Sequence, residues 1–263
     1  MNEGVSSIDP RSLTDRERVA EARGMHRIAV VIPAFNEDQS ILRVIEDIPT
    51  GLVEEVVVVD NRSTDSTASI ARQAGATVLV EPRRGYGSAC LTGVSYVIAR
   101  NYDIVVFLDA DYSDHPEEMT LLIEGITRGG VDLVIGSRAT GARQKGSMPA
   151  HSRFGNWLAT RLIAILWGVT FTDLGPFRAI RTVALQRIQM RDTDFGWTVE
   201  MQIKCARMGL RCLEVPVRYR RRIGVSKITG SVTGSFRAGW KILYTIARYG
   251  ISRRKPDRPT ESF

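Results

Sequence analysis

The stretch Ile104-Val105-Val106-Phe107-Leu108-Asp109-Ala110-Asp111 lies near the middle of this chain of 263 residues. Its apolar part predicts a buried strand, which ends in two aspartates separated by a single residue. Mg²⁺ and Mn²⁺ prefer oxygen ligands and usually take one or two protein carboxylates. Open α/β sheets bind ligands at the carboxyl ends of their strands. Asp109 and Asp111 are therefore candidate metal ligands, although turn and cap chemistry alone also explains such a pair.

Strand and helix patterns alternate along the first half of the chain. Short apolar or β-branched runs predict strands at 27–32, 56–59, 77–80, 104–108 and 131–135. Segments with helical spacing separate them, at 39–48, 64–74, 87–100 and 116–128. Strands that are apolar on both faces and separated by helices are typical of a mostly parallel sheet with helices on both faces. The predicted fold class is α/β.

The pattern changes after residue 137. A loop rich in Gly, Arg and Lys is followed by predicted helices at 153–167 and 199–208 and by strands at 177–181 and 212–219. The expected organisation is a flexible N-terminal extension over 1–24, one domain over 25–230, and a basic amphipathic helix and tail over 231–263.

Charge and cysteine content narrow the class of partner. The formal net charge of +7 predicts an anionic partner, such as nucleic acid, a phosphorylated substrate or an acidic lipid surface. Nucleic acid is disfavoured because the basic residues are dispersed and no recognition module is present. Cys90, Cys205 and Cys212 form no C-x-x-C pair, which predicts reduced thiols in the cytoplasm. We expect no membrane crossing, since no signal-peptide pattern and no apolar run near the roughly 20 residues of a span occur.

Polar clusters also follow the other predicted strands. Pro33-Ala34-Phe35-Asn36-Glu37 closes the first strand, and Asp60 closes the second, where an acid accepts hydrogen bonds from a ribose or a base edge. Pro82-Arg83-Arg84-Gly85-Tyr86-Gly87-Ser88 follows the third strand and opens a helix. Glycines, arginines and a helix N-terminus together suit a phosphate.

The ordered motifs P-A-F-N-E, V-V-D-N-R-S-T-D-S-T, R-G-Y-G-S-A, L-D-A-D-Y-S-D-H-P-E and G-S-R resemble those of family 2 glycosyltransferases with a GT-A fold. Among these the chain is most similar to the dolichyl- and polyprenyl-phosphate sugar synthases. The segments 173–178 (D-L-G-P-F-R) and 222–227 (R-I-G-V-S-K) resemble later motifs of that subgroup. The chain departs from it at Ser113, where the synthases often have glutamine, and at Gly175-Pro176, where they have Ser-Gly.

The resemblance implies roles for individual residues. The half at 25–137 would bind the nucleotide sugar through Pro33, Phe35, Glu37, Asp60, Arg84, Gly85, Asp109 and Ala110. Mg²⁺ or Mn²⁺ would bind Asp109 and Asp111. The half at 138–230 would bind the acceptor, with its phosphate near Ser137, Arg138, Arg153 and Arg178. The implied catalytic residues are Asp109, Asp111, Arg138 and Arg178, and Arg222 and Lys227 would belong to a loop over the diphosphate.

The implied reaction is a metal-dependent, inverting transfer of a hexose from a donor of the UDP-glucose or GDP-mannose type to a polyprenyl or dolichyl phosphate. A soluble hydroxyl acceptor is the alternative and would need a general base, for which Asp173, Asp194 and Glu200 are candidates. A nucleotidyltransferase would need a Gly-rich loop after the first strand, and a non-enzymatic scaffold has no use for the intact aspartate pair.

Two apolar segments bear arginines and aromatic residues, at 157–167 and 236–248. Such helices can lie in a membrane interface, or they can pack on the protein core or in a homo-oligomer. We expect peripheral association with the inner face of the membrane. We also expect that removal of 231–263 leaves nucleotide binding intact.

Overall fold

The computed structural model describes residues 26–224 and 232–251, with side chains of the second range described from residue 237 onward. The predicted extension at 1–24 and Lys227 lie outside the described residues.

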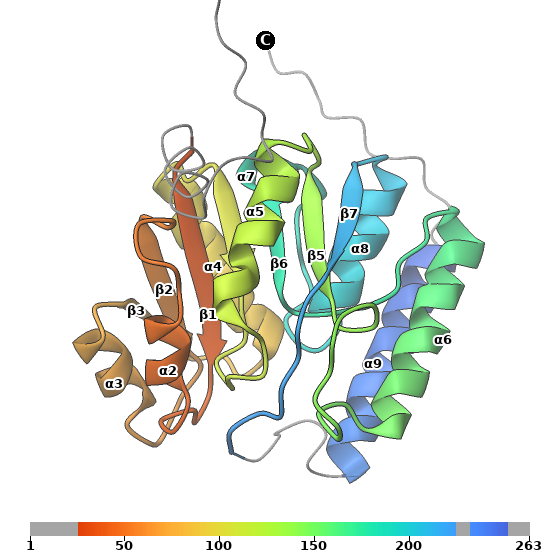
Figure 1. The fold of residues 1–263 in the computed structure, drawn as a ribbon. Helices are drawn as coiled ribbons and strands as arrows, with labels where there is room; N and C mark the ends of the chain where they lie inside the picture. The colour runs from red at the N-terminus through yellow and green to blue at the C-terminus, as the bar shows by residue number, and fades with distance from the viewer. Residues whose placement is uncertain (1–25, 225–231, 252–263) are drawn as a thin grey trace, which may run out of the picture.

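Seven strands of the described residues form one sheet in the order β3-β2-β1-β4-β6-β5-β7 (Figure 1). They are β1 (Ile28–Ala34), β2 (Glu55–Asp60), β3 (Thr77–Val80), β4 (Ile104–Phe107), β5 (Leu133–Ser137), β6 (Arg178–Arg181) and β7 (Cys212–Pro216). Neighbouring strands are parallel, except that β6 runs antiparallel to both β4 and β5. The predicted mostly parallel sheet is confirmed.

Helices cover both faces of this sheet (Figure 1). One face packs against α2 (Ile41–Glu46), α3 (Thr67–Gln73) and α5 (Met119–Thr127), which follows the 3-10 helix η1 (Pro116–Glu118). The other face packs against α4 (Tyr86–Ala99), α7 (Thr182–Ile188) and α8 (Trp197–Arg207). Beyond α8, helices α6 (Ala150–Trp167) and α9 (Val232–Ile251) lie side by side. None of the described helices combines the length and the hydropathy that a membrane-spanning segment needs.

Strand β1 shows why the sheet is buried on both sides. All of its residues are buried. Ala29 and Val31 belong to the core beneath α4 and α8, whereas Val30 and Ile32 belong to the core beneath α2 and α5. Each buried aliphatic side chain contributes about 1.5–3 kcal/mol relative to exposure. The well-packed sheet therefore fixes the positions of the polar residues that follow its strands.

Strand β6 brings the second half of the chain into the middle of the sheet. Arg178, its first residue, pairs with Phe107 of β4 and with Ile135 of β5. Because β6 is antiparallel, its beginning lies at the edge where its neighbours end. The two predicted halves at 25–137 and 138–230 therefore share one sheet.

Candidate active site

A pocket of about 380 Å³ opens at the carboxyl ends of β1, β2 and β4. It is lined by most of the residues predicted at the nucleotide and the metal, namely Pro33, Phe35, Glu37, Arg84, Gly85, Asp109, Ala110, Asp111 and Arg222. Residues that the sequence did not single out as ligands also line it, namely Ala34, Asn61, Tyr86, Ala89, Phe195 and Arg237. The parallel sheet thus brings the separate motifs of the sequence to one place.

Asp60 is not among the lining residues. Its Oδ1 accepts a hydrogen bond from the backbone N–H of Ser63 at 3.2 Å, so its carboxylate closes the turn after β2. The next residue, Asn61, lines the pocket instead. Asn61 Oδ1 accepts the backbone N–H of Gly85 at 2.8 Å, and its Nδ2 donates to the carbonyl of Arg83 at 2.7 Å. Asn61 therefore ties the end of β2 to the loop after β3, and the proposed contact of Asp60 with the nucleoside stays a prediction.

The loop after β3 is held against a remote segment of the chain. Gly85 has a φ of 144°, and a Cβ at this position would lie 2.1 Å from the carbonyl oxygen of Thr193. The same oxygen accepts the backbone N–H of Ser88 at 2.9 Å. Because Thr193 is only two residues before Phe195, this contact helps to position Phe195 in the pocket wall. Also in the pocket lining, the guanidinium of Arg84 lies over the ring of Phe35, 3.6 Å from its centroid.

Asp111 is buried and Asp109 is half-buried, and hydrogen bonds orient both carboxylates. Asp109 Oδ1 accepts the hydroxyl of Tyr86 at 3.1 Å. Asp111 Oδ1 accepts both the backbone N–H and the hydroxyl of Ser113, at 2.9 and 2.5 Å. Ser113, which departs from the resembled motif, thus holds one of the metal-binding candidates.

The electrostatics of the pair suit a cation. Burial and the neighbouring charge of Asp111 raise the pKa of Asp109 to about 7. Burial and the charge of Asp109 also raise the pKa of Asp114 well above its usual value, and neither carboxyl oxygen of Asp114 has a hydrogen-bond partner among the described residues. Carboxyl groups crowded in a low-dielectric site favour a divalent cation, so the residues fit Mg²⁺ or Mn²⁺.

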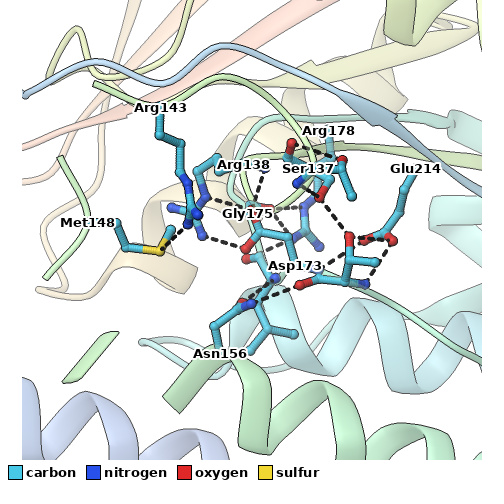
Figure 2. Close-up of polar contacts among 12 residues, drawn as sticks. Ser137, Arg138, Arg143, Met148, Asn156, Asp173, Gly175, Arg178 and Glu214 are labelled. Atoms are coloured by element: carbon cyan, nitrogen blue, oxygen red, sulfur yellow. Dashed lines mark hydrogen bonds and ion pairs between the residues drawn. The ribbon is translucent and has the colours of Figure 1, made fainter. Parts of the chain in front are cut away.

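Three of the acceptor residues predicted from the resemblance, Ser137, Arg138 and Arg178, lie around Asp173 (Figure 2). The guanidinium of Arg138 contacts both carboxylate oxygens of Asp173 at 2.8 Å, and the backbone N–H of Arg138 donates to Asp173 as well. Burial acts to raise the pKa of Asp173, but the charge and hydrogen bonds of Arg138 outweigh it and leave that pKa below its usual value. Asp173 is therefore a fixed counter-ion and a poor candidate for a general base.

Arg178, which the resemblance places near the acceptor phosphate, lies inside the protein. Its side chain is fully buried, and it donates to the carbonyls of Leu174, Gly175 and Thr198. These hydrogen bonds position the 174–175 loop, and a contact of Arg178 with the acceptor phosphate stays a prediction. Ser137 is also buried, and its hydroxyl pairs with that of Thr172 at 2.7 Å.

Arg153 lies exposed in the first turn of α6. One turn later, Asn156 accepts the backbone N–H of Leu174 at 2.8 Å and donates to the carbonyl of Thr172 at 2.9 Å. The start of α6 is thus fastened beside the Arg138–Asp173 pair (Figure 2). Among the predicted acceptor arginines, Arg153 is the one whose head faces solvent.

The other candidate bases differ from each other. Glu200 is buried, pairs with Lys204 at 2.9 Å and accepts the hydroxyl of Tyr249 at 2.6 Å, so it has a structural role. Asp194 lines the pocket, and burial together with Asp192 raises its pKa. If a base is required, Asp194 is the candidate in the right place.

Comparison with known proteins identifies the family. The sequence profile described as "Glycosyl transferase family 2" matches residues 29–189. An uncharacterized glycosyltransferase of Mycobacterium tuberculosis is 36% identical over 220 residues, which cover 82% of this chain and 97% of the relative. The undecaprenyl-phosphate mannosyltransferase of Micrococcus luteus is 30% identical over 240 residues, which cover 87% of this chain and 96% of the relative.

Solved structures show the same architecture. The crystal structure of glucosyl-3-phosphoglycerate synthase from Mycobacterium tuberculosis, in complex with Mn²⁺, UDP-glucose and phosphoglyceric acid, matches with a TM-score of 0.73 at 25% identity. The match covers 93% of this chain and 86% of that chain. With a profile that spans more than half of its length, the chain belongs to glycosyl transferase family 2 and is a glycosyltransferase with a GT-A fold.

Proposed function

We propose that this glycosyltransferase moves a hexose from a nucleotide sugar to the phosphate of a polyprenyl-type lipid. The observation that carries the proposal is the position of the pocket. The pocket contains the aspartate pair, and Arg237 of α9 belongs to its wall. The same helix carries further apolar and basic residues. The similarity to an undecaprenyl-phosphate mannosyltransferase supports the same acceptor class.

The donor would bind across the carboxyl edge of the sheet. Asp109 and Asp111 would hold Mg²⁺ or Mn²⁺, which when bound supplies positive charge to the diphosphate. Phe35 and Arg84 offer a flat surface and a charge for the nucleoside, and the guanidinium groups of Arg222 and Arg237 line the same pocket. Preorganised positive charge stabilises the diphosphate as it leaves.

In the proposed reaction, an oxygen of the acceptor phosphate attacks the anomeric carbon from the side opposite the diphosphate. The new carbon–oxygen bond forms as the bond to the diphosphate oxygen breaks, and its electron pair leaves with the nucleoside diphosphate. A phosphate is already ionised near neutral pH, so this attack needs no general base. This agrees with a site in which Asp173 and Glu200 are both committed to ion pairs.

The lipid would approach over the outer surface of α6 and α9, which we call the outer face. Its exposed apolar residues are Phe154, Trp157, Ile165 and Leu166 of α6 and Trp240, Leu243, Tyr244 and Ile251 of α9. Neither helix contains an aspartate or a glutamate, and both carry basic residues. Apolar and aromatic side chains with basic neighbours suit the interface of an anionic membrane, and we place the protein at its cytoplasmic face. Two copies joined through this face would bring like charges together.

A soluble acceptor is the second candidate, and two observations favour it. The pocket-lining Asp194 has a raised pKa and could serve as a base. The structurally similar glucosyl-3-phosphoglycerate synthase was crystallised with phosphoglyceric acid, which is soluble.

The deciding experiment supplies radiolabelled UDP- and GDP-hexoses, Mn²⁺, and either a polyprenyl phosphate in vesicles or phosphoglyceric acid. Label should enter an organic-extractable product only when the lipid phosphate is present, and Arg153→Ala should lower the rate without changing donor binding. Thermal stabilisation by each nucleotide with and without Mn²⁺ identifies the donor beforehand. Transfer to phosphoglyceric acid with none to lipid would overturn the lipid proposal and make Asp194 the candidate base.

A further inference from the structure

The guanidinium of Arg222 lies between two carboxylates of the pocket. Its Nη2 is 2.8 Å from Oε1 of Glu37, in the segment after β1, and its Nη1 is 3.0 Å from Oδ2 of Asp111, in the segment after β4. The next residue, Ile223, donates its backbone N–H to the carbonyl of Asp111 at 2.9 Å. Arg222 thus joins the segment after β7 to the segments that follow β1 and β4.

These contacts involve both carboxylate oxygens of the second metal-binding candidate. Oδ1 of Asp111 accepts two hydrogen bonds from Ser113, and Oδ2 faces Arg222. A Mg²⁺ ion binds carboxylate oxygens at about 2.0–2.1 Å. A divalent cation at that distance from Oδ2 would stand next to a guanidinium that already lies 3.0 Å from the same atom. Two cations so close repel each other strongly in a partly buried site.

We propose that Arg222 is a resident counter-ion of Asp111 and Glu37 that a divalent cation must displace. The displaced guanidinium then needs another anion, and the diphosphate of the donor is the group that brings one into the same pocket. Arg222 therefore opposes binding of the metal alone and favours binding of the metal together with the nucleotide. This inference rests on the proposed nucleotide-sugar donor and does not depend on the acceptor.

The proposal predicts opposite changes in two binding constants of one variant. In Arg222→Gln, free Mn²⁺ should bind about fivefold more tightly than in wild type when no nucleotide is present, since an ion pair of about 1 kcal/mol no longer competes. UDP or GDP in saturating Mn²⁺ should bind several-fold more weakly, because the diphosphate loses a cation. Electron paramagnetic resonance of free Mn²⁺ measures the first constant, and calorimetry measures the second.

The adjacent Arg221 provides the matched control. Its Nε donates to the carbonyl of Lys145 at 2.9 Å and its backbone N–H to Gln144, so it makes no contact with the pocket carboxylates in these hydrogen bonds. Arg221→Gln removes the same unit of charge and should leave both constants near those of wild type. Arg222→Lys, which keeps the charge, should retain most of the opposition to free Mn²⁺.

Three results would overturn the proposal. The first is that both binding constants change equally in Arg222→Gln and Arg221→Gln. The second is that the affinity of Arg222→Gln for free Mn²⁺ is unchanged, and the third is that this affinity falls. Thermal unfolding of each variant checks that the fold is intact before binding is compared. Failure of sugar transfer to lipid phosphate would leave these constants untouched, whereas failure of wild type to bind any nucleotide would refute the donor on which the inference rests.

Discussion

Nζ of Lys241 on α9 lies 3.0 Å from Oδ2 of Asp192, in the segment that delivers Asp194 and Phe195 to the pocket. The other oxygen of Asp192 accepts the backbone N–H groups of Asp194 at 2.8 Å and Gly196 at 3.1 Å. The ion pair therefore fixes the carboxylate that shapes one wall of the donor site. Helix α9 belongs to that wall, and the expectation that removal of 231–263 leaves nucleotide binding intact is not supported.

We expect Lys241→Met to weaken nucleotide binding about two- to fivefold, as the loss of a partly buried ion pair of about 0.5–1 kcal/mol implies. Calorimetry with UDP or GDP and Mn²⁺ measures the change. Arg161→Met, which removes an exposed charge from α6, is the control and should have no effect on this affinity. Equal affinities in all three proteins would show that α9 does not support the pocket wall.

The half-buried Asp109 leads to a prediction about the pH dependence of stability. Because its pKa is raised to about 7, protonation of this group is favoured in the folded state. Its contribution to stability is present below the ordinary aspartate pKa of about 3.9 and is lost as the pH rises to about 7. Asp109→Asn should therefore raise the free energy of unfolding by about 1–3 kcal/mol at pH 8, and by less at pH 5.

Urea denaturation of wild type and Asp109→Asn at both pH values, without divalent metal, measures this difference. A gain that is identical at pH 5 and pH 8 would contradict a raised pKa. The same variant should lose metal-dependent nucleotide binding, so that Asp109→Asn is more stable than wild type but inactive.

The Arg138–Asp173 ion pair predicts that substitution of Arg138 destabilises the fold. Arg138→Met leaves a fully buried carboxylate without its partner and should lower the free energy of unfolding by about 3–5 kcal/mol. The double variant Arg138→Met/Asp173→Asn should recover part of this loss. Arg143→Met serves as the control, since its guanidinium is exposed and makes a weak contact with Met148 Sδ at 3.8 Å. A stable Arg138→Met protein would show that the pair is not a structural unit.

If the outer face contacts the membrane, a charged substitution on it should weaken membrane binding. Leu243 on α9 and Leu42 on α2 are similarly exposed, at 38% and 42%, but only Leu243 belongs to the outer face. Leu243→Glu should reduce flotation with anionic vesicles, and Leu42→Glu should not. High salt should weaken the binding of wild type, since it screens attraction between basic residues and lipid. Equal flotation of both variants would argue against the outer face as the contact.

The sequence was most informative where local pattern decides structure. The strands β1, β2 and β4 are short apolar runs buried on both sides, and each is followed by polar residues, so both the strands and the donor residues after them could be predicted. The helix α7 was not predicted, because seven residues after a short strand carry little helical periodicity. The direction of β6 depends on pairing with β4 and β5, which no local pattern records.

The parts of the site that were missed come from distant segments. Phe195 and Arg237 reach the pocket through packing of the 191–196 segment and α9, and no motif marks them. The burial of Arg178 was missed as well, since an arginine in a resembled motif carries no local sign that its side chain lies inside the protein. The role of Lys227 stays a prediction outside the described residues.

The place of β6 also has a consequence for how the chain is made. Synthesis from the N-terminus releases β4 and β5 before the strand that joins them exists, since β6 begins at Arg178. Until then β4 presents an unpaired apolar edge, which is a template for aggregation. A nascent or truncated chain that stops near residue 137 should therefore need a chaperone or precipitate, and we expect the donor site not to fold as a separate module.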